Sequence, residues 1–499
     1  MKNSKFWLTV LALILALSLA ACAEDADEDG DGDTDGDDSA DGDTDGDGET
    51  ATPEMPVARC GMDSYTLVPK SEVGKIVEFS TKSGKTVRME EDPVFKLTPA
   101  AVDSLLEGSY KFTALSPVPY GCRVYRFRYS TQDKGKKIEA TAVLGIPTSA
   151  DLSTKDRPFI LALHGTTGFS APCAPSHGSD GPATAALLSS LGFITVHPDY
   201  IGMNGFGEPE ETVHGYLVGE QVAIGAWDAM RAAKELIEND LKDKVSGSDQ
   251  VMLWGGSQGG HSVLFSELYA PYYAPEFKVP GVVALVPPTD LMALAKEALS
   301  KVCPPSGSFV AVLTTMQIWY GKQAPLSEVF TDTEPYHIAQ NVPDYVLPKE
   351  ECKLGGPIDL GALTSLDQVY NSDFIDAMEK EWTDALNPWA AYLIENTLAT
   401  TSVPVLRHTP TLMVYSEKDD LVVTAPMLED FDRLCGMGYK LDFLECADAG
   451  HTEGAIWSLP EQLAWMKDRL AGKAQDEASL CKRAEPVCCT GRPDKACTR

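Results

Sequence analysis

The chain has 499 residues, 43% of them hydrophobic, and its formal net charge at pH 7 is −33. This length exceeds what one small core needs, so the sequence predicts either a large domain with insertions or two to three domains. The negative charge argues against nucleic acid as a partner, because phosphate groups would be repelled.

Residues 1–22 are predicted to be a targeting signal rather than part of a domain. Lys2 and Lys5 precede an apolar run, 6–19, that is short for a membrane span. The run ends in Leu-Ala-Ala-Cys at Cys22, which resembles the lipobox of bacterial lipoproteins. That resemblance implies lipidation of the cysteine and a membrane anchor in the bacterial cell envelope, at the outer membrane. An ordinary secretory signal, cleaved nearby, is the alternative.

Residues 23–56 form an acidic linker. Positions 24–54 hold 16 Asp and Glu and no Lys or Arg, and Asp-Gly-Asp-Thr-Asp-Gly-Asp occurs twice. Such a segment buries no apolar surface and is predicted to be disordered. Its spacing of aspartates is similar to that of calcium loops, but position 12 of each repeat lacks the glutamate ligand. A flexible spacer is therefore favoured over a calcium site.

Residues 57–289 alternate between strand and helix patterns, which predicts the first part of a mostly parallel central sheet flanked by helices. The expected elements, in chain order, are strands 123–129, 138–146 and 159–163, helix 183–191, strand 193–196, helix 218–236, the strand before Ser257, helix 262–269 and strand 282–286.

The stretch 251–261, Val-Met-Leu-Trp-Gly-Gly-Ser-Gln-Gly-Gly-His, is an apolar strand that runs through Gly-x-Ser-x-Gly into a helix pattern. A serine at such a strand-to-helix turn has its hydroxyl exposed at the top of the sheet. Gly255 and Gly259 fit because a Cβ would crowd so tight a turn. The sequence therefore predicts Ser257 to be a catalytic nucleophile, and a glycine-rich turn without catalysis is the alternative.

The negative charge that develops when a serine attacks a carbonyl needs two hydrogen-bond donors. The N–H of Gln258 is predicted to be one, because it lies at a helix N-terminus. The second is expected from the loop after strand 159–163, at Gly165 to Thr167, with Thr166 at its centre.

Residues 290–408 interrupt the alternation and are predicted to be a largely helical cap, inserted before the acid-bearing strand. The core resumes over 409–473, and a cysteine-rich tail, 474–499, is expected to pack through disulfides. The elements expected in these parts are helices 291–302 and 309–320, strands 411–415 and 440–446, and helix 461–470.

Besides Cys22 the chain has 11 cysteines, and export to an oxidising compartment predicts disulfides. The odd number leaves at least one thiol unpaired within the chain, and the sequence does not determine the pairing. Cys488, Cys489 and Cys497 lack a Cys-x2-Cys pair or a nearby histidine, so no metal site is predicted there.

Asp419 and His451 lie in loops directly after two later strands. With Ser257 they follow the order Ser, Asp, His, which predicts a catalytic triad in which the histidine takes the serine proton and the aspartate orients the imidazole. Asp420 is the alternative acid. Four other histidines receive other roles: structural for His261, ordering of the oxyanion loop for His164, and flanking of a pocket loop for His197 and His214.

With these three residues in place, the chain resembles the α/β-hydrolase superfamily over about residues 122–470. More narrowly, it is similar to the secretory lipases, the fungal lipase A type included. Residues 256–260, the Pro-Asp-Tyr-Ile-Gly loop at 198–202 and the helical insertion carry the narrower likeness. The resemblance implies an α/β-hydrolase fold, hydrolysis of carboxylic esters, triacylglycerols among them, a lid formed by the insertion, and no metal or organic cofactor.

The residues and the resemblance together predict an extracytoplasmic serine ester hydrolase, either a carboxylesterase or a triacylglycerol lipase, that forms an acyl-enzyme. Its expected partner is a small-molecule ester or lipid. A serine peptidase of the same fold is one alternative. A non-catalytic surface-binding lipoprotein is the other, since a fold does not fix a function.

Overall fold

The computed structural model describes residues 54–56, 64–108, 113–149, 155–207, 212–321, 324–333, 346–347, 352, 363–379, 388–493 and 497. The expected signal with Cys22, the acidic linker up to residue 53, and Cys60 lie outside these residues.

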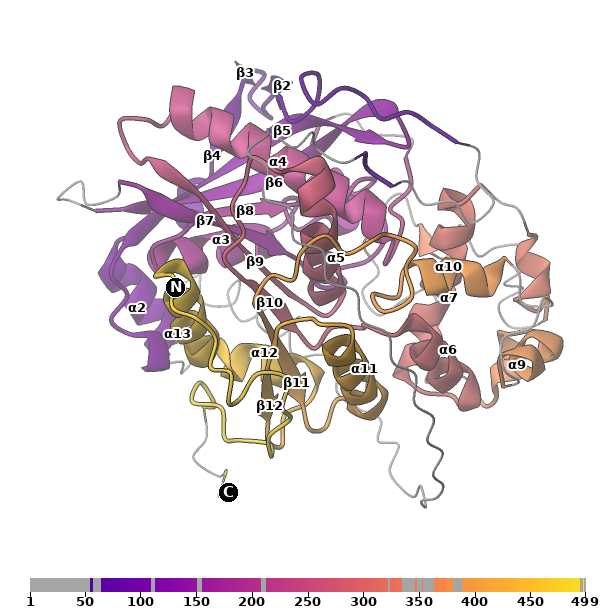
Figure 1. Cartoon of the computed structure of the whole chain (residues 1–499). Helices are drawn as coiled ribbons and strands as arrows, with labels where there is room; N and C mark the ends of the chain where they lie inside the picture. Colours follow the sequence, from indigo (N-terminus) through magenta and orange to yellow (C-terminus); the bar gives the residue numbers. More distant parts are fainter. Residues whose placement is uncertain are drawn as a thin grey trace, which may run out of the picture.

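A large mixed β-sheet forms the centre of the molecule (Figure 1). The order of strands across it is β1-β5-β6-β8-β7-β9-β10-β11-β12, and β4 also pairs with β5. The strands are β1 Ile76–Val77, β4 Met89–Glu91, β5 Gly121–Asp133, β6 Lys136–Thr148, β7 Arg157–Leu163, β8 Ile194–Pro198, β9 Gly247–Gly256, β10 Val282–Leu285, β11 Thr411–Ser416 and β12 Leu441–Cys446; β2 Phe79–Ser80 and β3 Thr86–Val87 form a separate pair.

The strands from β8 to β12 in this order run parallel, whereas β5 and β6 form a long antiparallel hairpin and β6 pairs antiparallel with β8. The expected fold class, a mostly parallel sheet with flanking helices, is confirmed. Parallel neighbours place their carboxyl ends at one edge of the sheet, which is where ligands bind in open α/β folds.

Strand β7 shows why these apolar runs form a central sheet. Phe159 and Leu161 belong to one core cluster, together with residues of helices α4 Gly219–Asn239 and α5 Gln258–Tyr273. Ile160 and Ala162, which alternate with them, belong to the core on the opposite face. A strand buried on both faces needs a continuous apolar run, as this sequence supplies.

Helices cover both faces of the sheet (Figure 1). The face with α4 and α5 also carries α11 Thr424–Gly436, whose Phe431 is fully buried. The other face carries α3 Asp180–Ser190 and α13 Leu459–Leu470. The remaining helices of the core are α2 Pro99–Gly108 and α12 His451–Trp457.

The inserted segment is largely helical where it is described, and it contains α6 Leu291–Ser300, α7 Pro304–Trp319, α9 Ser372–Glu379 and α10 Trp389–Glu395. These helices lie beside the sheet (right in Figure 1) and enclose their own apolar core, which includes Trp319 and Trp389. Helix α7 begins five residues before the expected start at 309. Two prolines fit its first turn, and Cys303 and Ser306 form a capping box.

Asn396, directly after α10, attaches this cap to the core. Its side-chain oxygen accepts from the Gly219 N–H at 2.9 Å, and its amide nitrogen donates to Tyr320 Oη of the cap at 2.8 Å. Its backbone oxygen lies 2.8 Å from Nε2 of His261 on α5. The cap and two helices of the core therefore meet at one buried residue.

The expectation of disulfides is confirmed. The pairs are Cys173–Cys352, Cys435–Cys481, Cys446–Cys489 and Cys488–Cys497. The last three all involve the tail after α13. Within the described part of the chain, Cys122 is a free thiol, and its side chain is buried.

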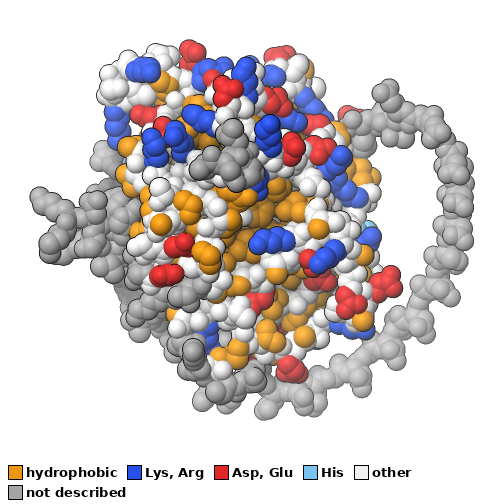
Figure 2. Space-filling view, turned by 90° about the vertical axis from the view of Figure 1, so that its left-hand side faces the viewer, with side chains coloured by type: hydrophobic (Ala, Val, Ile, Leu, Met, Phe, Trp, Pro, Cys, Tyr) orange, Lys and Arg blue, Asp and Glu red, His pale blue; other side chains and the backbone are white. Residues whose placement is uncertain are grey.

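The surface carries charges of both signs on the face beside α2 and α13 (Figure 2). Apolar side chains gather in the middle of this face, and many of its Lys and Arg lie above them. The acidic excess of the sequence is therefore not concentrated here. In the ranges that the structure describes, no helix combines the length and the apolar character that a membrane crossing requires.

Candidate active site

Ser257 occupies the sharp turn between β9 and α5, where its backbone has φ 56° and ψ −121°. This conformation is unfavourable for a residue with a side chain and is found where the surrounding structure enforces it. Two hydrogen bonds do so here. The Ser257 N–H donates to the Leu285 carbonyl of β10 at 2.8 Å, and the Ser257 carbonyl accepts from the His261 N–H at 3.1 Å.

The glycines around this serine are required by close backbone contacts. A Cβ on Gly255 would lie 2.4 Å from the carbonyl oxygen of Gly259. A Cβ on Gly259 would lie 2.0 Å from the Leu163 carbonyl oxygen. Any larger residue at either position would push the strand and the helix apart, which agrees with the reason inferred from the sequence.

Asp419 and His451 are brought together by the loops after β11 and β12. Nδ1–H of His451 donates to Oδ2 of Asp419 at 2.7 Å. Oδ1 of Asp419 accepts from the N–H groups of Leu421 at 3.0 Å and Val422 at 2.9 Å. Three donors thus fix the buried carboxylate, while the neighbouring Asp420 is exposed and does not make this contact.

The other ring nitrogen of His451, Nε2, is buried and has no hydrogen-bond partner among the described residues. Because Nδ1 carries the proton that Asp419 accepts, Nε2 of the neutral ring presents its lone pair. Burial lowers the pKa of His451, but the charge and hydrogen bond of Asp419, with smaller effects of Asp420 and Glu453, leave the pKa above its ordinary value. The ring is arranged to accept a proton at Nε2.

The two expected oxyanion donors are in Gln258, which follows Ser257, and in Thr166, in the loop after β7. Gln258 is the first residue of α5, so its N–H has no acceptor within the helix. The loop after β7 passes close by, because a Cβ on Gly165 would lie 3.7 Å from Cβ of Ser257. Thr166 follows in that loop, and its hydroxyl is 2.7 Å from the Tyr216 hydroxyl.

Four further histidines, His164, His197, His214 and His261, are buried. Burial lowers the pKa of His214 to about 3 and those of His197 and His261 to about 4, so all three are neutral. His214 Nε2 lies 2.7 Å from the side-chain nitrogen of Gln258. His164 Nδ1 lies 2.7 Å from the Gly165 carbonyl, next to the expected oxyanion loop.

The sequence does not predict a role for two residues at this site, Tyr216 and Asn396. Tyr216 is 50 residues from the threonine it contacts, and Asn396 is 135 residues from His261. Neither lies in a motif, and polar contacts over such separations leave no periodic signal in a sequence.

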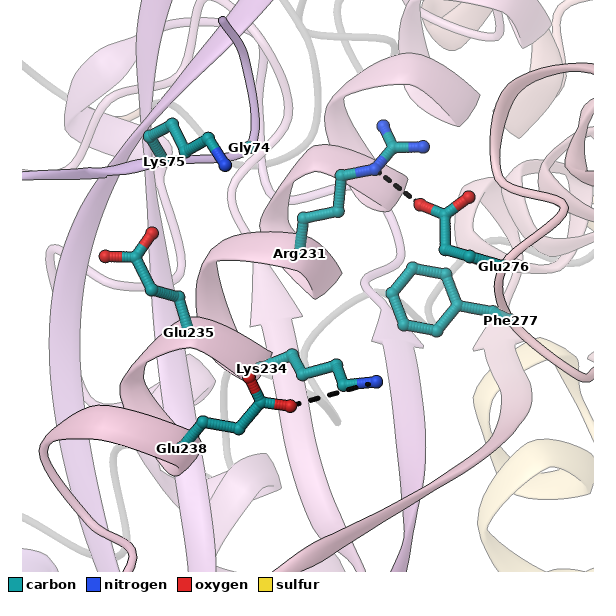
Figure 3. A pocket seen from close by; sticks show the side chains of 8 residues that line it. All are labelled: Gly74, Lys75, Arg231, Lys234, Glu235, Glu238, Glu276 and Phe277. Carbon is teal, nitrogen blue, oxygen red and sulfur yellow. Dashed lines mark hydrogen bonds and ion pairs between the residues drawn. The ribbon is translucent and has the colours of Figure 1, made fainter. Parts of the chain in front are cut away.

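A surface hollow beside α4 is separate from this site (Figure 3). Two ion pairs join four of its charged side chains: Arg231 and Glu276 at 2.6 Å, and Lys234 and Glu238 at 3.9 Å. No expected catalytic residue lines it. The candidate site is therefore the carboxyl edge of the sheet around Ser257.

A parallel sheet flanked by helices, with a serine on a strained strand-to-helix turn and an Asp–His pair after two later strands, defines the α/β-hydrolase class. The model of the secretory lipase family matches residues 180–349 and 363–477, which together are more than half of the chain. The chain belongs to the secretory lipase family.

Among individual proteins, the chain is 22% identical over 330 residues to Lipase 5 of Candida albicans, covering 61% of this chain and 63% of the relative. It thus spans less than two thirds of that protein. Among solved structures, it is similar to the rice cell wall degrading esterase LipA of Xanthomonas oryzae, with a TM-score of 0.61, 19% identity and coverage of 81% and 99%. For Candida antarctica lipase A the TM-score is 0.55 at 16% identity, with coverage of 83% and 85%. These two likenesses concern the fold.

Proposed function

We propose that this protein is a serine hydrolase of carboxylic esters. The observation that carries the proposal is the bond between Asp419 and Nδ1 of His451, which leaves Nε2 buried and unpaired at the same sheet edge as Ser257. Membership of the secretory lipase family and the names of the relatives, a lipase and an esterase, support esters as the substrate class.

In the proposed reaction, Oγ of Ser257 attacks the ester carbonyl while His451 Nε2 takes the hydroxyl proton. The carbonyl oxygen becomes an oxyanion that accepts from the N–H groups of Gln258 and Thr166. When the tetrahedral intermediate collapses, His451 returns the proton to the leaving alcohol and an acyl-enzyme remains. Water, deprotonated by His451, then attacks the acyl carbon, and the acid departs as Ser257 regains its proton.

The apolar character of the cap favours a substrate with an apolar acyl group, which the cap would cover. Its described helices enclose a large apolar core and lie beside the sheet. A cover of this kind excludes water from the reacting ester and buries an apolar chain.

The test is hydrolysis of p-nitrophenyl esters, from acetate to palmitate, by the purified protein. We expect turnover, and the acyl length with the highest kcat/KM separates an esterase from a lipase. A folded protein that hydrolyses none of these esters would refute the proposal and favour a peptidase or a binding protein of the same fold.

The pH dependence follows from the raised pKa of His451. Only the neutral ring accepts the serine proton, so kcat/KM should fall as the pH drops through that pKa, with a midpoint above 6.5. Asp420→Asn removes one of the negative charges that raise the pKa and should move the midpoint to lower pH. A pH profile of kcat/KM for both proteins checks this, and a midpoint below 6.5 in the wild type would contradict it.

The contact between Tyr216 and Thr166 predicts a smaller effect on catalysis. Tyr216→Phe should lower kcat about three- to tenfold with little change in KM, which corresponds to the loss of one net hydrogen bond. Thr166→Val should lower kcat by about the same factor. The double variant should have a kcat only slightly lower than either single variant, because both changes remove the same contact. Steady-state kinetics of the four proteins measure this, and additive losses would show that the contact does not matter.

The protein is also proposed to act outside the cytoplasm. Disulfides persist in oxidising compartments, and the family is secretory. The finer proposal of a lipid anchor rests on Cys22 and its preceding residues. Incorporation of labelled palmitate into the wild type, and its loss in Cys22→Ser, tests the anchor.

A further inference from the structure

The C-terminal tail runs back along the edge of the sheet on the side of the candidate base. β12 is the last strand of the sheet, and His451 follows it. The N–H of Val487 donates to the Glu445 carbonyl at 2.8 Å, and the Val487 carbonyl accepts from the Ala447 N–H at 2.8 Å. The tail therefore covers the exposed edge of β12 at the carboxyl end of the strand, where the loop that leads to His451 begins.

The same piece of tail also holds the far end of the histidine segment. The Gly491 N–H donates to the carbonyl of Trp457, the last residue of α12, at 2.8 Å. The Thr490 N–H donates to Glu461 of α13 at 2.8 Å. Residues 446–457 are thus fixed at both ends, with His451 between them.

Arg492 joins these two ends through a single side chain. Its Nη1 donates to the Ala447 carbonyl at 3.4 Å and lies 3.7 Å from the Asp448 carboxylate. Its guanidinium also lies over the ring of Trp457, 4.7 Å from the ring centre. The Arg492 side chain is only 12% exposed, whereas its partner Asp448 is 40% exposed.

A disulfide also links the tail to β12 covalently. Cys446 ends β12, five residues before His451, and is bonded to Cys489; both side chains are buried. We call residues 487–492 the tail clamp. They lie beyond residue 477, where the match to the secretory lipase family ends.

The histidine segment needs outside support for a physical reason. The helix α12 has seven residues, too few to be stable by itself. Asp448, in the loop before it, has a φ of 56°, in the left-handed region that residues with a side chain adopt at some cost in energy. A catalytic group displaced by about 1 Å can lose about 100-fold in rate.

We propose that the tail clamp is a positioning element of the active site. In this proposal, the Cys446–Cys489 bond and Arg492 hold the His451 ring in its hydrogen bond with Asp419. This rests on the proposed function, in which His451 is the base. The clamp does not touch the reacting atoms and acts only through the position of residues 446–457.

The chain offers a matched control for the disulfide. Cys446–Cys489 and Cys435–Cys481 span 43 and 46 residues, so their removal should lower thermal stability by similar amounts. The second bond joins α11 to the tail outside the clamp. For the arginine, the control is Arg483, which pairs with Asp432 of α11 at 3.3 Å.

The experiment compares Cys446→Ala/Cys489→Ala and Arg492→Gln with Cys435→Ala/Cys481→Ala and Arg483→Gln, each in the full chain. The first two should lower kcat about tenfold or more and leave KM within about twofold, because binding groups are untouched while the base moves. The acid limb of their pH profile should shift to lower pH, since a loosened Asp419 contact no longer raises the pKa of His451. The two controls should keep the wild-type kcat. If the disulfide variant does not fold, Arg492→Gln carries the test.

Unchanged kcat in an active Arg492→Gln variant, or equal losses in both disulfide variants, would overturn the proposal and leave the tail a merely stabilising element. If the wild type hydrolyses no ester, the proposed function fails separately. The clamp is then judged by NMR titration of His451, whose signal is identified by its loss in His451→Gln. A lower pKa in Arg492→Gln than in the wild type supports the clamp, and an equal pKa refutes it.

Discussion

Replacing Ser257 with alanine should lower kcat on every ester by about 10⁴- to 10⁶-fold, while the protein stays folded. The loss is large because no acyl-enzyme forms without the hydroxyl. The remaining rate comes only from binding and from the oxyanion donors. Alanine also fits the turn, where the larger constraint falls on Gly255 and Gly259. Initial rates on the best p-nitrophenyl ester measure the effect.

Ser266→Ala is the matched control. Ser266 lies on the same helix, α5, and is fully buried, and its hydroxyl has no hydrogen-bond partner among the residues described. The same atom is deleted in both variants, so a loss specific to Ser257 reports on chemistry rather than on packing. If Ser257→Ala kept even a tenth of the wild-type rate, the serine would not be the nucleophile.

Asp419→Asn should lower kcat by about 10⁴-fold, whereas Asp420→Asn should keep kcat near the wild-type value. An amide at position 419 preserves the shape of the side chain but loses the charge that stabilises the protonated imidazole. It can also present an N–H to Nδ1, which would move the ring proton to Nε2 and block the lone pair needed there. Asp420 is exposed and does not contact Nδ1.

Measured above the acid limb, the two asparagine variants decide which carboxylate is the acid. A large loss in Asp420→Asn with normal turnover in Asp419→Asn would reverse the assignment. Comparable large losses in both would mean that the two charges act together rather than through one hydrogen bond.

Those parts of the fold that the sequence predicted well rest on local signals. The run at β7 and the strand that ends at Ser257 are apolar over lengths typical of buried strands, and the glycines mark the turn directly. The order of Ser257, Asp419 and His451, each after a strand end, needed no long-range information. The choice between Asp419 and Asp420 did, because it depends on which carboxylate the loop turns inward.

The parts that the sequence did not reveal depend on contacts between distant residues. The pairing of cysteines has many combinations, and spacing alone does not select Cys446–Cys489. The return of the tail along β12 uses backbone hydrogen bonds, which any sequence could make. The sequence does not predict the early start of α7 for a different reason. Two prolines suggest a break in a helix unless they occupy its first turn.

The attachment of the cap at Asn396 has a consequence for protein engineering. This residue belongs to the insertion by sequence, yet it accepts from the N–H of Gly219 and contacts the ring of His261 on the helix that follows Ser257. A cap transplanted from a relative would therefore have to bring an equivalent asparagine, or leave a buried amide and a buried imidazole without partners. Chimeras that exchange the cap should keep residues 388–408 from the recipient and replace only the helices before them.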